Sequence, residues 1–111
     1  MARIELKDLT GNGRVHSLSG QERGVEARRV FNLDLLDRSV DPVTVDVPND
    51  LDAISPSFFQ GMFARSLVEV FERDQDRFLE HYSFRAPTHV LAQVHRGIMA
   101  VLTRRPTQVA N

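Results

Sequence analysis

The clearest pattern in the chain is a stripe of apolar side chains between residues 56 and 72. The stripe recurs at the i, i+3, i+4 and i+7 spacing, which is one face of an α-helix. Ser55 is a favoured N-cap residue, and Pro56 suits the first helical position. The pattern therefore predicts a central helix over residues 56–72. Its predicted core stripe is Phe59, Met62, Phe63, Ser66, Leu67, Val70 and Phe71.

Two further amphipathic helices are predicted, one before the central helix in the sequence and one after it. Ser19 and Glu22 fit a capping box, which predicts a helix from about residue 20 to residue 36. Thr88 follows a proline and is expected to cap a last helix. The apolar face of the first helix is predicted to be Val25, Ala27, Val30, Phe31 and Leu35. Its water-facing residues are predicted to be Arg23, Glu26, Arg28 and Arg29. The apolar face of the last helix is predicted to be Val90, Leu91, Val94, Ile98, Val101 and Leu102.

Three segments have strand patterns. Residues 3–18 alternate apolar and polar on both sides of Gly11-Asn12-Gly13, which predicts a β-hairpin. Residues 43–47 are rich in valine and threonine, which favours a central strand. Residues 77–84 carry aromatic side chains on one parity and are interpreted as a strand.

Together these elements predict one compact α/β domain over residues 1–105. The sheet is expected to be mixed, with parallel strands near 43–47 and 78–84 and the hairpin as an antiparallel edge. Three amphipathic helices pack on it. Residues 106–111 follow the last apolar stripe and are predicted to form a loose tail.

Composition narrows the function classes. The chain has 111 residues, of which 41% are hydrophobic and 26% charged, as in ordinary globular domains. Its net charge of −1 argues against a nucleic-acid binder, and the absence of cysteine excludes disulfides and thiolate catalysis. Charges interrupt the N-terminal segment and no run is long enough to span a bilayer, so we expect a cytoplasmic protein with no membrane partner.

No cofactor or metal is expected. The histidines at 16, 81, 89 and 95 lack the spacing of a metal site, so they are interpreted as ordinary surface or core residues. Asp46, Asp50 and Asp52 lie near one strand end, where acids could bind a divalent ion or act as a general base. Acids that cap turns are the commoner reading of such a loop.

The segment from Val43 to Phe63 resembles the STAS domain (sulphate transporter and anti-sigma-factor antagonist), and within it the uncharacterised bacterial STAS-like branch. The features that carry the resemblance are a strand that ends in Asp46, a loop containing Ile54, and the helix start Ser57-Phe58. The resemblance implies a STAS-like fold and a regulatory binding module rather than an enzyme. It also implies a protein partner, such as an ATPase of the histidine-kinase type.

In the anti-sigma antagonists a serine at this helix start is phosphorylated, and the resemblance places that acceptor on Ser57. The flanking aspartate and glycine of those domains correspond here to Ser55 and Phe58, so this chain departs from the phosphorylated pattern at both positions. A serine in the first helical turn lies beside free N–H groups that can compensate a phosphate. The alternative is a plain capping serine.

The candidate partner-binding residues are therefore Asp46, Asp52, Ser55 and Phe58, with Ser57 as the candidate phosphoacceptor. Phe58 lies off the predicted stripe, so it is either an exposed interface anchor or packed under the 48–54 loop. Two other functions remain open: a small hydrolase or transferase that uses Ser57 with a nearby aspartate, and a homo-oligomeric module that pairs through exposed helix faces. A homodimer is accordingly among the partners considered.

Overall fold

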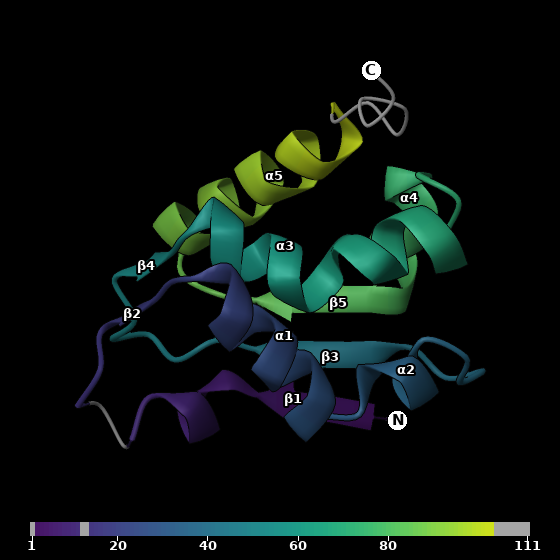
Figure 1. Cartoon of the computed structure of the whole chain (residues 1–111). Coiled ribbons are helices and arrows are strands. Elements are labelled where there is room, and N and C mark those ends of the chain that lie inside the picture. The colour runs from purple at the N-terminus through teal and green to yellow at the C-terminus, as the bar shows by residue number, and fades with distance from the viewer. Residues whose placement is uncertain (1, 12–13, 104–111) are drawn as a thin grey trace.

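The computed structural model describes residues 2–11 and 14–103, and the expected tail at 106–111 lies outside them. Three parallel strands form the main sheet in the order β1 (Ala2–Glu5), β3 (Val43–Asp46) and β5 (Tyr82–Arg85) (Figure 1). A smaller parallel pair joins β2 (Ser17–Leu18) to β4 (Ala53–Ile54). The α/β class is thus confirmed, as are the central position of the valine-rich strand and its parallel pairing with the aromatic strand.

The predicted N-terminal hairpin is wrong. β1 pairs in parallel with β3, and a short 3-10 helix, η1 (Leu6–Leu9), follows it where the hairpin strand was expected to continue. Leu6 is buried, so this turn directs the chain into the core rather than back along β1. Alternation identifies a strand but not its partner, and both sheets are parallel throughout rather than mixed.

The single helix predicted over residues 20–36 is two helices, α1 (Gln21–Val30) and α2 (Leu33–Leu36). Asn32 separates them in the left-handed conformation, with a φ of 55°. The break rotates the second segment, so Leu33 is buried and Leu35 is exposed, against the prediction. Val25 and Val30, on α1 before the break, are exposed as well, although they were predicted to face the core. The N-cap is Gly20 rather than Ser19.

The aromatic segment after the central helix also differs from the prediction. Asp74 caps a short helix, α4 (Gln75–His81), by accepting a hydrogen bond of 3.1 Å from the Arg77 N–H. The strand β5 therefore starts only at Tyr82. Phe78 and Tyr82 share a face at the helical i, i+4 spacing as well as at the strand spacing, which is why parity alone misassigned the segment.

The central and last helices lie where they were predicted, but the central helical segment ends at Val70 rather than at residue 72, and the N-cap of the last helix is Pro87 rather than Thr88. α3 (Pro56–Arg65) continues directly into one π-helical segment, η2 (Ser66–Val70), and α5 (Thr88–Leu102) closes the described chain. Figure 1 shows the helices stacked on one side of the main sheet. On the other side the strands expose alternate residues: Arg3 and Ser83 are exposed, and Thr44 and Asp46 are half-buried.

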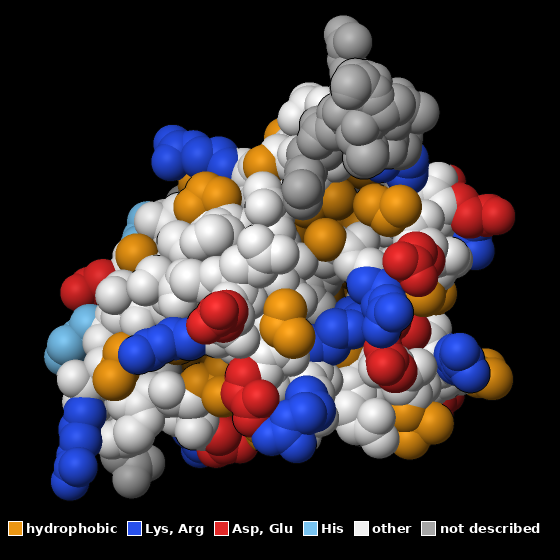
Figure 2. Space-filling view, in the orientation of Figure 1, with side chains coloured by type: hydrophobic (Ala, Val, Ile, Leu, Met, Phe, Trp, Pro, Cys, Tyr) orange, Lys and Arg blue, Asp and Glu red, His pale blue; other side chains and the backbone are white. Residues whose placement is uncertain are grey.

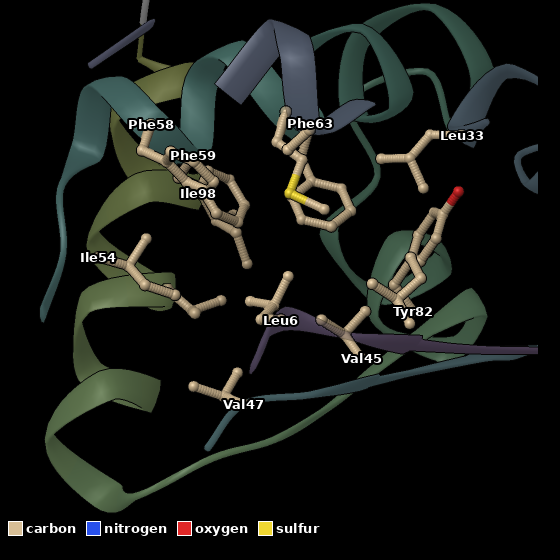
Figure 3. Packing of buried hydrophobic residues seen from close by; sticks show 14 of the residues in the cluster. Leu6, Leu33, Val45, Val47, Ile54, Phe58, Phe59, Phe63, Tyr82 and Ile98 are labelled. Atoms are coloured by element: carbon tan, nitrogen blue, oxygen red, sulfur yellow. The ribbon is translucent and has the colours of Figure 1, made fainter. Parts of the chain in front are cut away.

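The core lies between this helical layer and the sheet (Figure 3). Phe63 is 2% exposed and occupies its centre. Its ring centroid lies 5.3 Å from that of Tyr82, 5.5 Å from that of Phe78 and 5.4 Å from that of Phe84. The stripe of α3 therefore faces the sheet, as predicted.

α1 lies unusually close to α3. A Cβ atom added to Gly61 would be 2.2 Å from the Gln21 carbonyl oxygen, and one added to Gly24 would be 2.2 Å from the Phe58 carbonyl oxygen. Only glycine permits this backbone-to-backbone contact. It fixes the position of Arg28, one turn further along α1.

We predict that Phe63→Ala lowers the free energy of unfolding by about 3–5 kcal/mol, because it removes a buried ring and leaves a cavity. Chemical denaturation followed by circular dichroism measures this. Met99→Ala on α5 is the control, because that side chain is 50% exposed and should cost much less. Equal losses in the two variants would contradict the packing described here.

Candidate functional site

The start of α3 is built as the sequence predicts. Ser55 is the N-cap residue, in extended conformation, and its Oγ accepts a hydrogen bond of 3.1 Å from the Phe58 N–H. Pro56 occupies the first helical position, where its missing N–H costs nothing. The Ser55 N–H donates to the Leu18 carbonyl at 2.9 Å, so among residues 55–58 the Ser57 N–H is the amide left to meet an anion.

Ser57 is exposed in this first turn. Its Oγ lies 3.1 Å from the Oγ of Ser55, and either atom could be the donor. The hydroxyl is therefore reachable from solvent, at the positive end of the α3 dipole. Of the candidate residues, the structure brings together these two serines.

The candidate acids, Asp46 and Asp52, contact residues other than Ser57. Asp46, at the carboxyl end of β3, forms an ion pair with Arg3 on the neighbouring strand. The hydrogen bond and charge of Asp46 raise the pKa of Arg3. Asp52 is exposed in the loop before β4, where its N–H donates to the His16 carbonyl at 2.7 Å. Within the described residues, no hydrogen bond joins either acid to Ser57.

Two separate hollows reflect this division. Asp46 lines a cavity of about 540 Å³ at the carboxyl edge of the main sheet, together with Asn49, Phe84 and Arg85. Ser55 lines another of about 320 Å³, with Ile54, Gln93 and Arg96 among its walls. Asp46 and Ser55 therefore do not share one concave site, and Asp52 and Ser57 line neither of these two cavities.

Phe58 is only 2% exposed, so its interpretation as an exposed interface anchor is wrong. It belongs to the core cluster with Leu51 and Ile54, as in the alternative that packs it beneath the loop (Figure 3). The helix buries a wider face than its stripe suggests, because α1 lies against the side of α3 that carries Phe58.

A buried polar cluster that the sequence reading missed lies at the other end of α3. Arg28, expected to face water, is 8% exposed, and its guanidinium reaches between α1 and α3. Nη1 donates to the Met62 carbonyl at 3.0 Å and to Ser66 Oγ at 2.8 Å. Nη2 donates to Asp37 at 2.6 Å, and both Nε and Nη2 donate to Asp34. We call Arg28, Asp34, Asp37, Ser66 and Tyr82 the Arg28 cluster.

Asp37 is the acceptor at the centre of the cluster. Its side chain is 1% exposed, and Oδ1 accepts from Ser66 Oγ at 2.7 Å and from the Tyr82 hydroxyl at 2.5 Å. Oδ2 accepts from Arg28. A buried carboxylate is tolerated only when paired and hydrogen-bonded in this way. The cluster thereby ties α1, α2, η2 and β5 together.

The pKa directions follow from these contacts. Burial lowers the pKa of Arg28, but the hydrogen bonds and charges of Asp37 and Asp34 outweigh it, so the net shift is upward. The hydrogen bond from Arg28 lowers the pKa of Asp34. Burial, followed by the hydrogen bond to Asp37, raises the pKa of Tyr82 well above its ordinary value.

The Arg28 contacts lie where α3 passes into the π-helical segment η2. The Ser66 N–H bonds to the Phe63 carbonyl, and the Met62 carbonyl accepts from Arg28. A side-chain donor inserted into the helical ladder is a recognised accompaniment of such irregular turns. The sequence pattern of α1 could not reveal the burial of Arg28, because Arg28 and Arg29 together are typical of a basic pair on a solvated helix face.

The Arg28 cluster borders a cavity of about 490 Å³, whose rim carries Arg38, Arg65 and Glu69. Opposite charges alternate along this rim: Arg65 lies 3.8 Å from Asp34 and 3.5 Å from Glu69. Figure 2 shows the same mixture of basic and acidic side chains over this whole face, with hydrophobic side chains in separate spots. The face carries no one-sign field that would select a polyanion or a polycation.

Residues 2–11 and 14–103 contain no group of three metal-ligating side chains. Over the same residues, the helices are too short or too polar to cross a membrane. A scan of protein-family models, a search of curated proteins and a search of solved structures each found no match.

We predict that Asp37→Ala destabilises the protein by about 3–5 kcal/mol, because it leaves the Arg28 charge and the Tyr82 hydroxyl buried without their acceptor. Chemical denaturation gives the value. Glu69→Ala is the control, since the Glu69 side chain is 66% exposed, and it should change stability by less than about 0.5 kcal/mol. A small effect at Asp37 would mean that the cluster is open to water.

We also predict that Tyr82, the one tyrosine of the chain, does not ionise while the protein is folded. Its pKa is raised on folding, so its contribution to stability is complete below the ordinary value of about 10 and is lost as the pH rises above it. Tyrosinate absorbance should therefore appear together with unfolding. The urea-denatured chain, as control, should titrate near pH 10; a native titration at that pH would contradict the burial.

Proposed function

We propose that the protein is a non-catalytic regulatory module of the bacterial cytoplasm that binds a protein partner and is controlled by phosphorylation of Ser57. The observation that carries the proposal is the exposed Ser57 hydroxyl in the first turn of α3, next to the Ser55 cap. A kinase can reach an exposed hydroxyl of this kind, and the cap formed by Ser55 holds the helical turn that carries it. The resemblance of residues 43–63 to STAS domains supports the same assignment.

The electrostatics of the helix start suit such a switch. A phosphate adds about −1.5 to −2 charges at neutral pH. The Ser57 N–H and the positive dipole end of a ten-residue helix compensate part of that charge, so α3 need not melt. The remaining negative charge alters the surface that a partner meets. In this proposal, phosphorylation acts at Ser57 alone and changes the charge of the surface around it.

The partner class follows from the resemblance. STAS domains of the antagonist type imply an ATPase of the histidine-kinase type as the binding partner. Asp52 and Ser55 lie on the segment that leads into α3, and we include them in the contact surface. Phe58 is left out, because it is buried.

A hydrolase or transferase is less well supported. A nucleophilic serine needs a base within hydrogen-bond reach, and the described hydrogen bond of Ser57 goes to Ser55. Asp46 is already engaged by Arg3. The arrangement therefore favours a hydroxyl that receives a phosphate over one that attacks a substrate.

We predict that Ser57→Asp changes the set of proteins recovered with the tagged chain from lysate of its native host, whereas Ser57→Ala recovers what the unphosphorylated chain recovers. If one interfacial charge contact contributes about 1.4 kcal/mol to binding, its loss or gain changes the affinity for the partner about tenfold. Quantitative mass spectrometry measures the recovered partners and also detects a phosphate on Ser57.

Ser83→Ala is the matched control, since Ser83 is an exposed serine on β5, in another part of the fold. Circular dichroism verifies that each variant is folded. The proposal fails if the Ser57 variants, the Ser83 variant and the wild type recover the same partners in the same amounts and no phosphate is found on Ser57.

A further inference from the structure

β1 is an open edge of the main sheet. It stands at the end of the strand order, and among residues 2–11 and 14–103 the strand that pairs with it is β3. Figure 1 shows β1 at the outer side of the sheet, with β3 between it and β5. An unpaired edge presents a row of backbone donors and acceptors that can template another strand. The strand contains no proline or glycine that would prevent such pairing.

The charges on β1 are self-complementary. Arg3 and Glu5 flank the buried Ile4 and lie on the open face of the sheet, with 2.9 Å between Arg3 Nε and Glu5 Oε2. Their side chains are 52% and 35% exposed. If a second β1 runs antiparallel with the two Ile4 residues opposite each other, Arg3 faces Glu5 of the second copy. The same contact occurs twice, as a two-fold axis requires.

We propose that two copies of the chain pair through β1, antiparallel about Ile4, to form one continuous six-stranded sheet. Opposite charges directly across an antiparallel pair stabilise it, and like charges destabilise it. Each Arg3 would then stand between Asp46 of its own chain and Glu5 of the second copy. A sheet of six strands is of usual size, whereas three strands of four residues make a small one.

The opposite edge, β5, does not offer the same complementarity. Its open face carries Ser83 and Arg85 and has no acid. A two-fold pairing there would leave each arginine without an opposite charge, which is why we assign the contact to β1. This inference does not depend on Ser57 or on phosphorylation, and its test is separate.

The experiment uses the untagged full chain and measures mass by sedimentation equilibrium over a concentration series. We expect the measured mass of the wild type to rise with concentration from 12.6 kDa towards twice that mass. Arg3→Glu and Glu5→Arg each place like charges opposite each other, and each should weaken association roughly tenfold or more. The charge swap Arg3→Glu/Glu5→Arg restores opposite charges, so it should associate as the wild type does.

Mixing the two single variants is the decisive measurement. Arg3→Glu carries two acids on β1 and Glu5→Arg carries two arginines, so the pair is complementary and should form a one-to-one heterodimer. Circular dichroism confirms that each variant is folded before mixing. The proposal is overturned if the wild type stays at the monomer mass, if the single variants associate as strongly as the wild type, or if the mixture does not associate.

Discussion

The guanidinium of Arg28 is the group on which the arrangement of the helices depends. From α1 it reaches a backbone carbonyl of α3, the hydroxyl of Ser66 in η2, and two acids in and after α2. Through Asp37 it is connected to Tyr82 on β5. A charge buried this far is stable only when its donors are occupied, so these elements must keep their mutual positions. The close approach of Gly24 and Gly61 brings α1 near enough to α3 for the contact.

This anchoring has a consequence for the surface at the other end of α3. The helix is held at its carboxyl end by Arg28 and along its length by Phe59 and Phe63, which pack on the sheet. Its amino end is capped by Ser55 and leaves Ser57 exposed. A helix fixed in this way can carry a charge at its free end without moving. The proposed switch therefore acts by changing the electrostatics of a rigid surface, which needs no rearrangement of the core.

The two faces of the main sheet differ in polarity. Its buried face is apolar and covered by helices, whereas its open face carries Arg3, Glu5, Asp46 and Arg85 across neighbouring strands. Arg3 meets both Glu5 and Asp46, so one cation serves two acids within the chain. A charged open face discourages burial under further apolar layers. A further strand can join this sheet only at its two edges, β1 and β5, which differ in their charged residues.

The sequence by itself determined the local features. Ser55 and Pro56 start α3, the stripe through Phe63 faces the core, and residues 43–46 form the central strand, because caps, periodicity and β-branched side chains act over a few residues. Only the tertiary structure decided that β1 pairs with β3, that Phe58 is buried, and that Arg28 is an interior residue. Each of these depends in part on groups more than thirty residues away: β3 for β1, Gly24 of α1 for Phe58, and Met62 and Ser66 for Arg28. Spacing along the chain carries no record of such contacts, since their energy arises only when the packed elements meet.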